Sequence, residues 1–165
     1  MGRPRRPRKI TLPSCGKSAY HSLFEIQIIN EVMEMNRILI VDDEEIGRTV
    51  MEDIFGRYGK SVSVSTGKGA LTVYEKAIER GTAFNLVLLD ISLEDISGVE
   101  VLKKIKQIDG KRGNASAVVI MVTAHSERDL VVDSIKSGCK AYFIKPLKQE
   151  TVDKKMSELG FSQVK

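Results

Sequence analysis

The sequence predicts an α/β protein: a doubly wound sheet of five parallel strands with five helices covering its two faces. Two observations lead to this fold class. From residue 36 onward, short aliphatic runs alternate with segments whose apolar residues recur at helical spacing. The joints between them are short, which is typical of successive βα units. We therefore expect one domain over residues 36–160, a basic extension over residues 1–35 and a tail over residues 161–165.

The strands are predicted from apolar runs. Residues 37–41 (RILIV) form an almost continuous aliphatic run, as expected of a strand covered on both faces. In the second strand, Val62 and Val64 alternate with serines, which indicates a position nearer the edge of the sheet. Residues 109–116, with two glycines, are expected to form a loop before the fourth strand. The predicted strands are residues 37–41, 61–65, 84–89, 118–122 and 141–144.

The helices are predicted from apolar residues at i, i+3 and i+4 spacing. In the first helix, Ile46, Val50, Ile54 and Tyr58 predict the buried face, and Gly59 predicts the end. The predicted helices are residues 44–58, 70–80, 97–108, 126–137 and 147–159. The inward residues of the middle three are predicted to be Leu71, Tyr74 and Ile78; Val101, Leu102, Ile105 and Ile108; and Leu130, Val131, Ser134 and Ile135.

The composition indicates a globular chain. It is 42% hydrophobic and 29% charged, and its aliphatic runs are too short to cross a bilayer. The two cysteines, Cys15 and Cys139, are far apart in the sequence. This excludes a disulfide framework and a zinc ribbon, and it fits a reducing compartment.

The positive charge is unevenly distributed. The whole chain carries +4, and residues 1–35 carry six basic and three acidic side chains, a net charge of +3. A basic tail can attract nucleic acid or anionic lipid, but a solvated, disordered arm is the simpler interpretation. Residues 23–32 also have the spacing of a short amphipathic helix, and Met33 and Met35 leave a later translation start open.

Three acidic residues fall where predicted strands end. Asp42 and Asp43 follow the first strand, and Asp90 follows the third. Carboxyl ends of parallel strands share one edge of a sheet, so these carboxylates converge if the two strands are neighbours. Such oxygen ligands suit Mg²⁺, which offsets their mutual repulsion. Thr123 and Lys145 end the fourth and fifth strands. A carboxylate, a metal, a hydroxyl and an ammonium together favour phosphoryl transfer.

Each of these residues also has a simpler explanation. Asp43 could cap the following helix, and Asp90 could be a turn residue. Thr123 is a common residue type in strands, and Lys145 could be a solvated charge. All of them fall at one predicted edge, however, so the set as a whole indicates a functional site.

Four stretches resemble a known family: ILIVDDEE (residues 38–45), LVLLDISLEDISGVEVLKKIK (86–106), VVIMVTAHS (118–126) and AYFIKPL (141–147). In this order and spacing they are similar to the receiver domain of two-component response regulators, of the CheY-like type. The resemblance covers residues 36–159. It implies a flavodoxin-like fold with the strand order 2-1-3-4-5.

The resemblance implies roles for the acidic residues and their neighbours. Asp90 would accept a phosphoryl group. Asp42 and Asp43 would hold Mg²⁺ together with Asp90, with Asp43 as a direct ligand, and Ser92 would contribute its backbone carbonyl. Ser92 and His125 also stand at positions that tune the lifetime of the phosphorylated state in this family. No cofactor other than Mg²⁺ is implied.

The resemblance extends to the last two strands. Thr123 and Lys145 would bind phosphoryl oxygens, and Thr123 and Tyr142 would form the switch that reports phosphorylation. Pro146 matches a proline that follows a cis peptide bond. The chain departs from the family pattern at Glu94, where a proline is usual. This departure concerns the rigidity of residues 91–97, which follow Asp90 and which we call the acceptor loop.

The implied function is that of a stand-alone, cytoplasmic response regulator, a phosphoacceptor and not an enzyme. A sensor histidine kinase or phosphotransfer protein would supply the phosphoryl group in a Mg²⁺-dependent reaction. A downstream effector protein would bind the face formed by the fourth helix, fifth strand and fifth helix. Stable binding to nucleic acid or membrane is not expected, and a phosphorylation-linked homodimer stays open. The alternative is a phosphorylation-independent interaction or nucleic-acid-binding module that uses the basic tail.

Other phosphate-handling classes fit the sequence less well. A haloacid-dehalogenase-type phosphatase needs a second aspartate where this chain has Ser92. A P-loop needs serine or threonine after Lys68, where Gly69 stands, and a dinucleotide-binding fold needs glycines after the first strand, where the chain has acidic residues.

Overall fold

The computed structural model describes residues 35–113, 116–124 and 128–164. In this part of the chain five parallel strands form one sheet in the order β2-β1-β3-β4-β5, which confirms the predicted fold class and strand order. The strands are β1 Asn36–Val41, β2 Gly59–Val64, β3 Leu86–Leu89, β4 Val118–Thr123 and β5 Ala141–Ile144.

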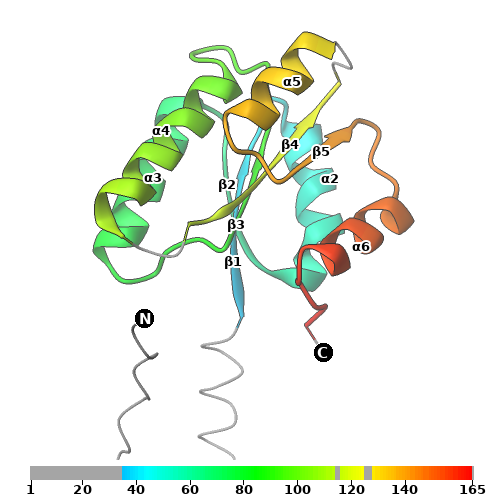
Figure 1. Ribbon diagram of the computed structural model, residues 1–165. Helices are drawn as coiled ribbons and strands as arrows, with labels where there is room; N and C mark the ends of the chain where they lie inside the picture. Colours follow the sequence, from blue (N-terminus) through cyan, green and yellow to red (C-terminus); the bar gives the residue numbers. More distant parts are fainter. Residues whose placement is uncertain (1–34, 114–115, 125–127, 165) are drawn as a thin grey trace, which may run out of the picture. The chain divides into compact units, whose positions relative to one another are not determined.

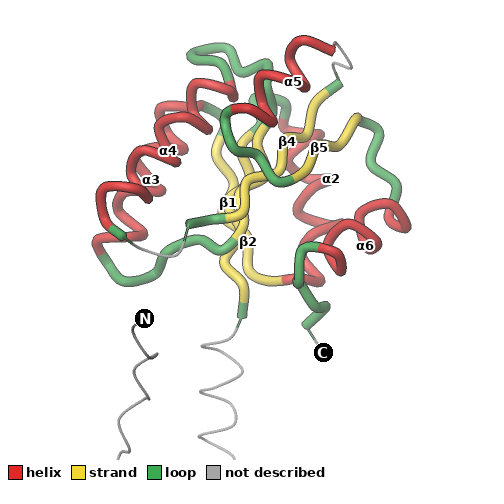
Figure 2. Tube along the Cα trace, in the orientation of Figure 1, coloured by secondary structure: helices red, strands yellow, loops and turns green. Residues whose placement is uncertain are grey.

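Five α-helices connect and cover these strands within the described residues. They are α2 Glu45–Phe55, α3 Gly67–Glu79, α4 Gly98–Arg112, α5 Arg128–Lys136 and α6 Gln149–Glu158, with a 3-10 turn, η1 Gly56–Tyr58, between α2 and β2. Figures 1 and 2 show α3 and α4 side by side on one side of the strands and α2 and α6 on the other. This is the two-sided covering expected of a doubly wound sheet.

The core has two parts because alternate strand residues point to opposite faces of the sheet. In β1, Leu39 and Val41 join the cluster that contains residues of α3 and α4, whereas Ile38 and Ile40 join the cluster that contains residues of α2 and α6. All four side chains are completely buried. A strand buried on both faces has no polar alternation, which is why this aliphatic run predicted β1 so clearly.

The predicted buried face of the first helix is wrong in its first half only, because Tyr58 is buried and Ile54 packs on the core as predicted. Ile46 and Val50 are exposed, at 79% and 43% of their surface, whereas Met51 and Phe55 are buried. Both pairs have helical spacing, and the pair with the larger side chains packs on the sheet because it removes more apolar surface from water. The α-helix ends at Phe55, and Gly59 begins β2 after the 3-10 turn.

Two further expectations need correction. The predicted loop over residues 109–116 is wrong in its first half, because α4 continues through Gly110 and ends at Gly113. The φ angle of Gly113 is 61°, the left-handed conformation that often ends a helix. On α5, Ile135 is 58% exposed and does not face inward as predicted, whereas Ser134, also predicted to face inward, is buried.

The structure describes the C-terminal end of the chain to residue 164 but not the N-terminal extension. Residues 1–34, which make up nearly all of the predicted basic extension, lie outside the described residues. The described part of the predicted tail is attached to the domain: Phe161 packs on the cluster of α2 and α6, and the Val164 amide donates to the Arg57 carbonyl at 2.7 Å. Within the residues that the structure describes, no helix combines the length and the apolar character needed to cross a membrane.

Candidate functional site

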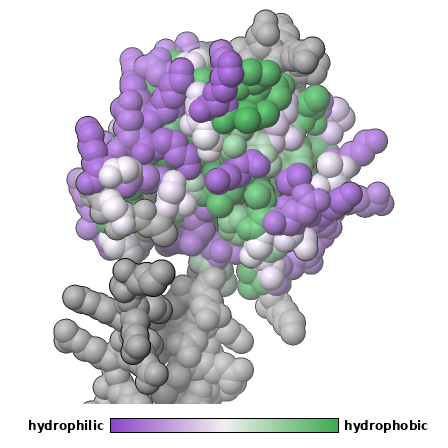
Figure 3. Space-filling view, in the orientation of Figure 1, coloured by the Kyte–Doolittle hydropathy of each residue, from purple (hydrophilic) through white to green (hydrophobic). Residues whose placement is uncertain are grey.

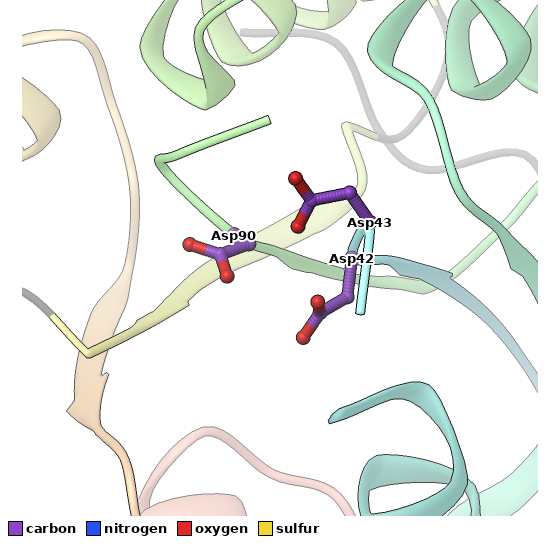
Figure 4. Close-up of side chains that lie close together, drawn as sticks. All are labelled: Asp42, Asp43 and Asp90. Atoms are coloured by element: carbon purple, nitrogen blue, oxygen red, sulfur yellow. The ribbon is translucent and has the colours of Figure 1, made fainter. Parts of the chain in front are cut away.

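Three carboxylates meet at the carboxyl edge of the sheet. β1 and β3 are neighbours, with Val41 opposite Leu89, so the residues that follow these two strands come together. Carboxylate oxygens of Asp42, Asp43 and Asp90 lie within 4.8 Å of one another, and Figure 4 shows the three side chains clustered beyond the strand ends. Asp42 and Asp90 are buried and Asp43 is half-buried. We call these three residues the acidic cluster.

The backbone around the acidic cluster fixes two of its carboxylates. The Asp90 amide donates to the Val41 carbonyl at 2.9 Å, which extends the pairing of β1 and β3 by one step. One oxygen of Asp42 accepts from the Glu44 amide at 2.9 Å, and one oxygen of Asp90 accepts from the Ser92 amide at 3.1 Å. Each carboxylate is therefore held by the turn that follows it, a common use of aspartate in turns.

Lys145 bridges two members of the acidic cluster. Its ammonium Nζ lies 2.6 Å from Asp42 Oδ2 and 2.8 Å from Asp90 Oδ2, and 4.0 Å from the exposed carboxylate of Glu44. Burial by itself lowers the pKa of Lys145, but the hydrogen bonds and charges of Asp42 and Asp90 outweigh burial and raise the pKa above its usual value. The lysine therefore stays charged between two buried carboxylates.

The remaining predicted site residues lie on the neighbouring strands and loop. Thr123, the last residue of β4, is completely buried, and its carbonyl accepts from the Lys145 amide at 2.9 Å. Tyr142 in β5 is half-buried and packs on the cluster that contains residues of α3 and α4. The peptide bond between Lys145 and Pro146 is cis, as the resemblance implied. His125 lies outside the described residues.

Arg48 is a site residue that our reading of the sequence missed. Its guanidinium donates to the backbone carbonyls of Asp42, at 2.8 Å, and Asp43, at 3.0 Å. The arginine thereby holds the turn that presents both aspartates, from the helix that follows them. The sequence offered one signal for this role: Arg48 is a basic residue five positions after an acidic pair, near the start of a predicted helix.

The loop from Asp90 to Gly98 folds back tightly at the edge of the sheet. The Gly98 amide donates to the Ile91 carbonyl at 2.8 Å. A Cβ atom at Gly98 would lie 2.0 Å from the carbonyl oxygen of Asp90, so no larger residue fits this backbone. Ser97 accepts from the Glu100 amide at 3.2 Å and caps α4.

The residues present fit a hard divalent cation. Three carboxylates and one ammonium leave a formal charge of −2, and the donors are all oxygens, which are the ligands that Mg²⁺ prefers in proteins. The fold and this site together define a doubly wound α/β domain with an acidic edge whose ligands suit a divalent cation. The family model described as "Response regulator receiver domain" matches residues 38–157, and the chain belongs to that family.

The chain is similar to known proteins over the same region. It is 37% identical over 117 residues to the chemotaxis protein CheY of Bacillus subtilis, covering 71% of this chain and 91% of CheY. It is 35% identical over 121 residues, 73% of this chain, to the transcriptional regulatory protein ZraR of Klebsiella oxytoca, but spans only 25% of that protein. Among solved structures, a chain of the CheX–CheY–BeF3–Mg²⁺ complex of Borrelia burgdorferi superposes with a TM-score of 0.64 at 27% identity, covering 75% of this chain and 89% of that one.

Proposed function

We propose that this protein is a response regulator that accepts a phosphoryl group on Asp90, in a Mg²⁺-dependent reaction, from a sensor histidine kinase or a phosphotransfer protein. One observation carries the proposal: the carboxylates of Asp42, Asp43 and Asp90 converge while Lys145 contacts two of them. Membership of the receiver family and the Mg²⁺ in the Borrelia complex support it.

The proposed transfer uses Asp90 as the nucleophile. A carboxylate oxygen of Asp90 attacks the phosphorus of a phosphohistidine, so that an O–P bond forms and the N–P bond breaks. The imidazole leaves with the bonding electrons and takes a proton from water, and the product is an acyl phosphate. Lys145, already 2.8 Å from Asp90, offsets the negative charge that develops on the transferred oxygens.

The other residues of the acidic edge support this step. Bound by Asp42, Asp43, Asp90 and the Ser92 carbonyl, Mg²⁺ supplies positive charge to the phosphoryl oxygens. Asp43 is the least buried of the three aspartates and is the proposed direct ligand. Asp42 holds Lys145 at 2.6 Å and thereby keeps the ammonium beside Asp90. The protein is in this proposal a phosphoacceptor that assists its own reaction, not an enzyme acting on a separate substrate.

The proposed switch connects this site to β4 and β5 through Thr123 and Tyr142. Thr123 donates a hydrogen bond to a phosphoryl oxygen of the modified Asp90, and Tyr142 moves inward as Thr123 shifts. The result is a change in the populations of two packings of the same fold. Thr123 is buried and Tyr142 is half-buried, which fits a rearrangement just beneath the surface.

The proposed effector surface is formed by α5, β5 and α6, the fourth predicted helix, fifth strand and fifth helix. Val132, Ile135 and Ile144 are exposed there, at 37%, 58% and 51% of their surface. Figure 3 shows hydrophobic residues gathered around α5 and β5, while hydrophilic residues cover α3 and α4. A downstream protein that binds this surface would sense the state of the switch.

The remaining features of the proposal concern context. We keep residues 36–160 as the receiver domain, place the protein in the cytoplasm and expect no stable binding to nucleic acid or membrane. Cys139, free and buried, is compatible with a reducing compartment. Two points stay predictions: that the receiver domain acts without an attached output domain, and that phosphorylation is linked to formation of a homodimer.

The test is to incubate the wild-type protein with the small phosphodonor acetyl phosphate and measure its intact mass. We expect the mass to increase by one phosphoryl group when Mg²⁺ is present and to stay unchanged when EDTA removes the metal. Hydroxylamine should release the group, because an acyl phosphate reacts with this nucleophile and a phosphoserine does not. An unchanged mass with Mg²⁺ would favour the phosphorylation-independent interaction module instead.

A further inference from the structure

Asp95, in the acceptor loop, contacts a helix that is distant from it in the sequence. Asp95 lies between β3 and α4, in the loop of residues 91–97. One of its carboxylate oxygens accepts from the Gly67 amide at 2.8 Å and the other accepts from the Lys68 amide at 2.9 Å. These are the first two amides of α3, which have no partner within the helix. Asp95 therefore caps a helix that it does not belong to.

Apolar packing supports the same contact between the loop and the helix. Gly67 is buried, and a Cβ atom there would lie 2.5 Å from Ile96 Cγ1 and 2.7 Å from Val101 Cγ2. The loop residue next to Asp95 thus sits directly against the start of α3. Thr66 caps the same helix independently, since its hydroxyl accepts from the Gly69 amide at 3.1 Å.

The acceptor loop, held to α3 in this way, directly follows Asp90 and contains Ser92, the two residues that the proposed function assigns to the metal site at this end of β3. Ser92 stands three residues before Asp95, and its amide already donates to Asp90. The base of the loop is closed by Gly98 and Ile91. Position 94 holds glutamate, so the loop has no proline to restrict its backbone. Its outer half is fixed instead by the contacts of residues 95 and 96 with α3.

We propose that Asp95 is a positioning residue for the phosphoacceptor site, which it serves by tying the acceptor loop to α3. The inference rests on the proposed function, because the groups that Asp95 would position are the Ser92 carbonyl and the Asp90 carboxylate, which are proposed ligands of Mg²⁺. The amides, above all that of Lys68, lower the pKa of Asp95 below its usual value, so the carboxylate stays charged. A charged cap at a helix N-terminus is also favoured by the helix dipole.

The experiment compares Asp95→Ala with Thr66→Ala, which removes the other cap of the same helix. Mg²⁺ affinity is measured by calorimetric titration of the full chain, and acetyl phosphate-driven phosphorylation is measured across Mg²⁺ concentrations. For Asp95→Ala we expect Mg²⁺ affinity to fall about 10-fold, the size of effect typical for residues that orient metal ligands. Phosphorylation should need correspondingly more Mg²⁺, while its rate at saturating Mg²⁺ stays close to that of the wild type.

The control variant separates positioning from simple helix stability. Thr66→Ala should lower the thermal midpoint without changing Mg²⁺ affinity, since the hydroxyl it removes bonds to Gly69 of its own helix. Asp95→Asn keeps one acceptor oxygen, so its Mg²⁺ affinity should lie between those of Asp95→Ala and the wild type. If Asp95→Ala folds poorly, Asp95→Asn takes its place in the comparison. Wild-type affinity in both Asp95 variants, or an equal loss in Thr66→Ala, would overturn the positioning role. Absence of Mg²⁺ binding in the wild type would instead overturn the proposed function.

Discussion

The Asp90→Asn protein is expected to take up no phosphoryl group from acetyl phosphate and Mg²⁺, whereas the wild type takes up one. Asparagine has nearly the same shape as aspartate, so the fold and the turn with Ser92 can persist. Its neutral amide, however, lacks the negative charge that makes the carboxylate a nucleophile and a metal ligand. The loss should be complete, and intact-mass measurement after identical incubation detects it directly.

The matched control for this prediction is Asp53→Asn. Asp53 is an exposed aspartate on α2, outside the acidic cluster. This variant should gain one phosphoryl group as the wild type does, because it leaves Asp90 and the rest of the acidic cluster unchanged. A phosphoryl group that persists on Asp90→Asn, or one that disappears in Asp53→Asn, would show that the acceptor lies elsewhere.

Gly98→Ala is expected to have the largest effect on stability. The new methyl group would lie 2.0 Å from the Asp90 carbonyl oxygen and 2.9 Å from the Ile91 Cα atom, both part of the backbone. Relief requires the acceptor loop to move away from α4, which we expect to cost about 1 to 3 kcal/mol. For a domain whose total unfolding free energy is about 5–15 kcal/mol, this is a large share. Urea unfolding measures the change.

Gly110→Ala is the control on the same helix. Gly110 is exposed within α4, and a Cβ atom there would meet nothing within 4 Å. Alanine should therefore stabilise the protein by about 0.5–1 kcal/mol, the difference in helix propensity. Equal effects of the two substitutions would mean that the close approach of Gly98 to Asp90 is not what holds the loop.

The architecture could be predicted from the sequence because its signals are redundant. Each βα unit combines an aliphatic run, a turn and a helical period, and β1 alone contributes four completely buried side chains, Ile38 to Val41. The meeting of Asp42, Asp43 and Asp90 could be predicted from two further points: parallel strands end at a common edge, and the family resemblance implied that the first and third strands are neighbours.

The features that could not be predicted depend on three-dimensional contacts. The spacing of Ile46 and Val50 is as helical as that of Met51 and Phe55, and only packing against the sheet decides which pair is buried. Gly110 suggested a loop because glycine disfavours helices, but the surrounding residues of α4 outweigh a single glycine.

The bridge between Asp95 and α3 is a third case of this kind. It joins residues 27 and 28 positions apart in the chain, which no local pattern encodes. From the sequence alone, the acceptor loop showed only the absence of a proline at position 94. The contact that fixes the loop became visible with the structure.

In the proposed function, three carboxylates on two separate turns bind one Mg²⁺ ion together. A titration of the wild-type protein with Mg²⁺, followed by the backbone amide resonances in nuclear magnetic resonance spectra, tests it most directly. We predict that amides beside Asp42 and Asp43 and those beside Asp90 shift along saturable curves with a single dissociation constant. Shifts confined to one of the two turns, or no saturable shift in either, would contradict a shared metal site.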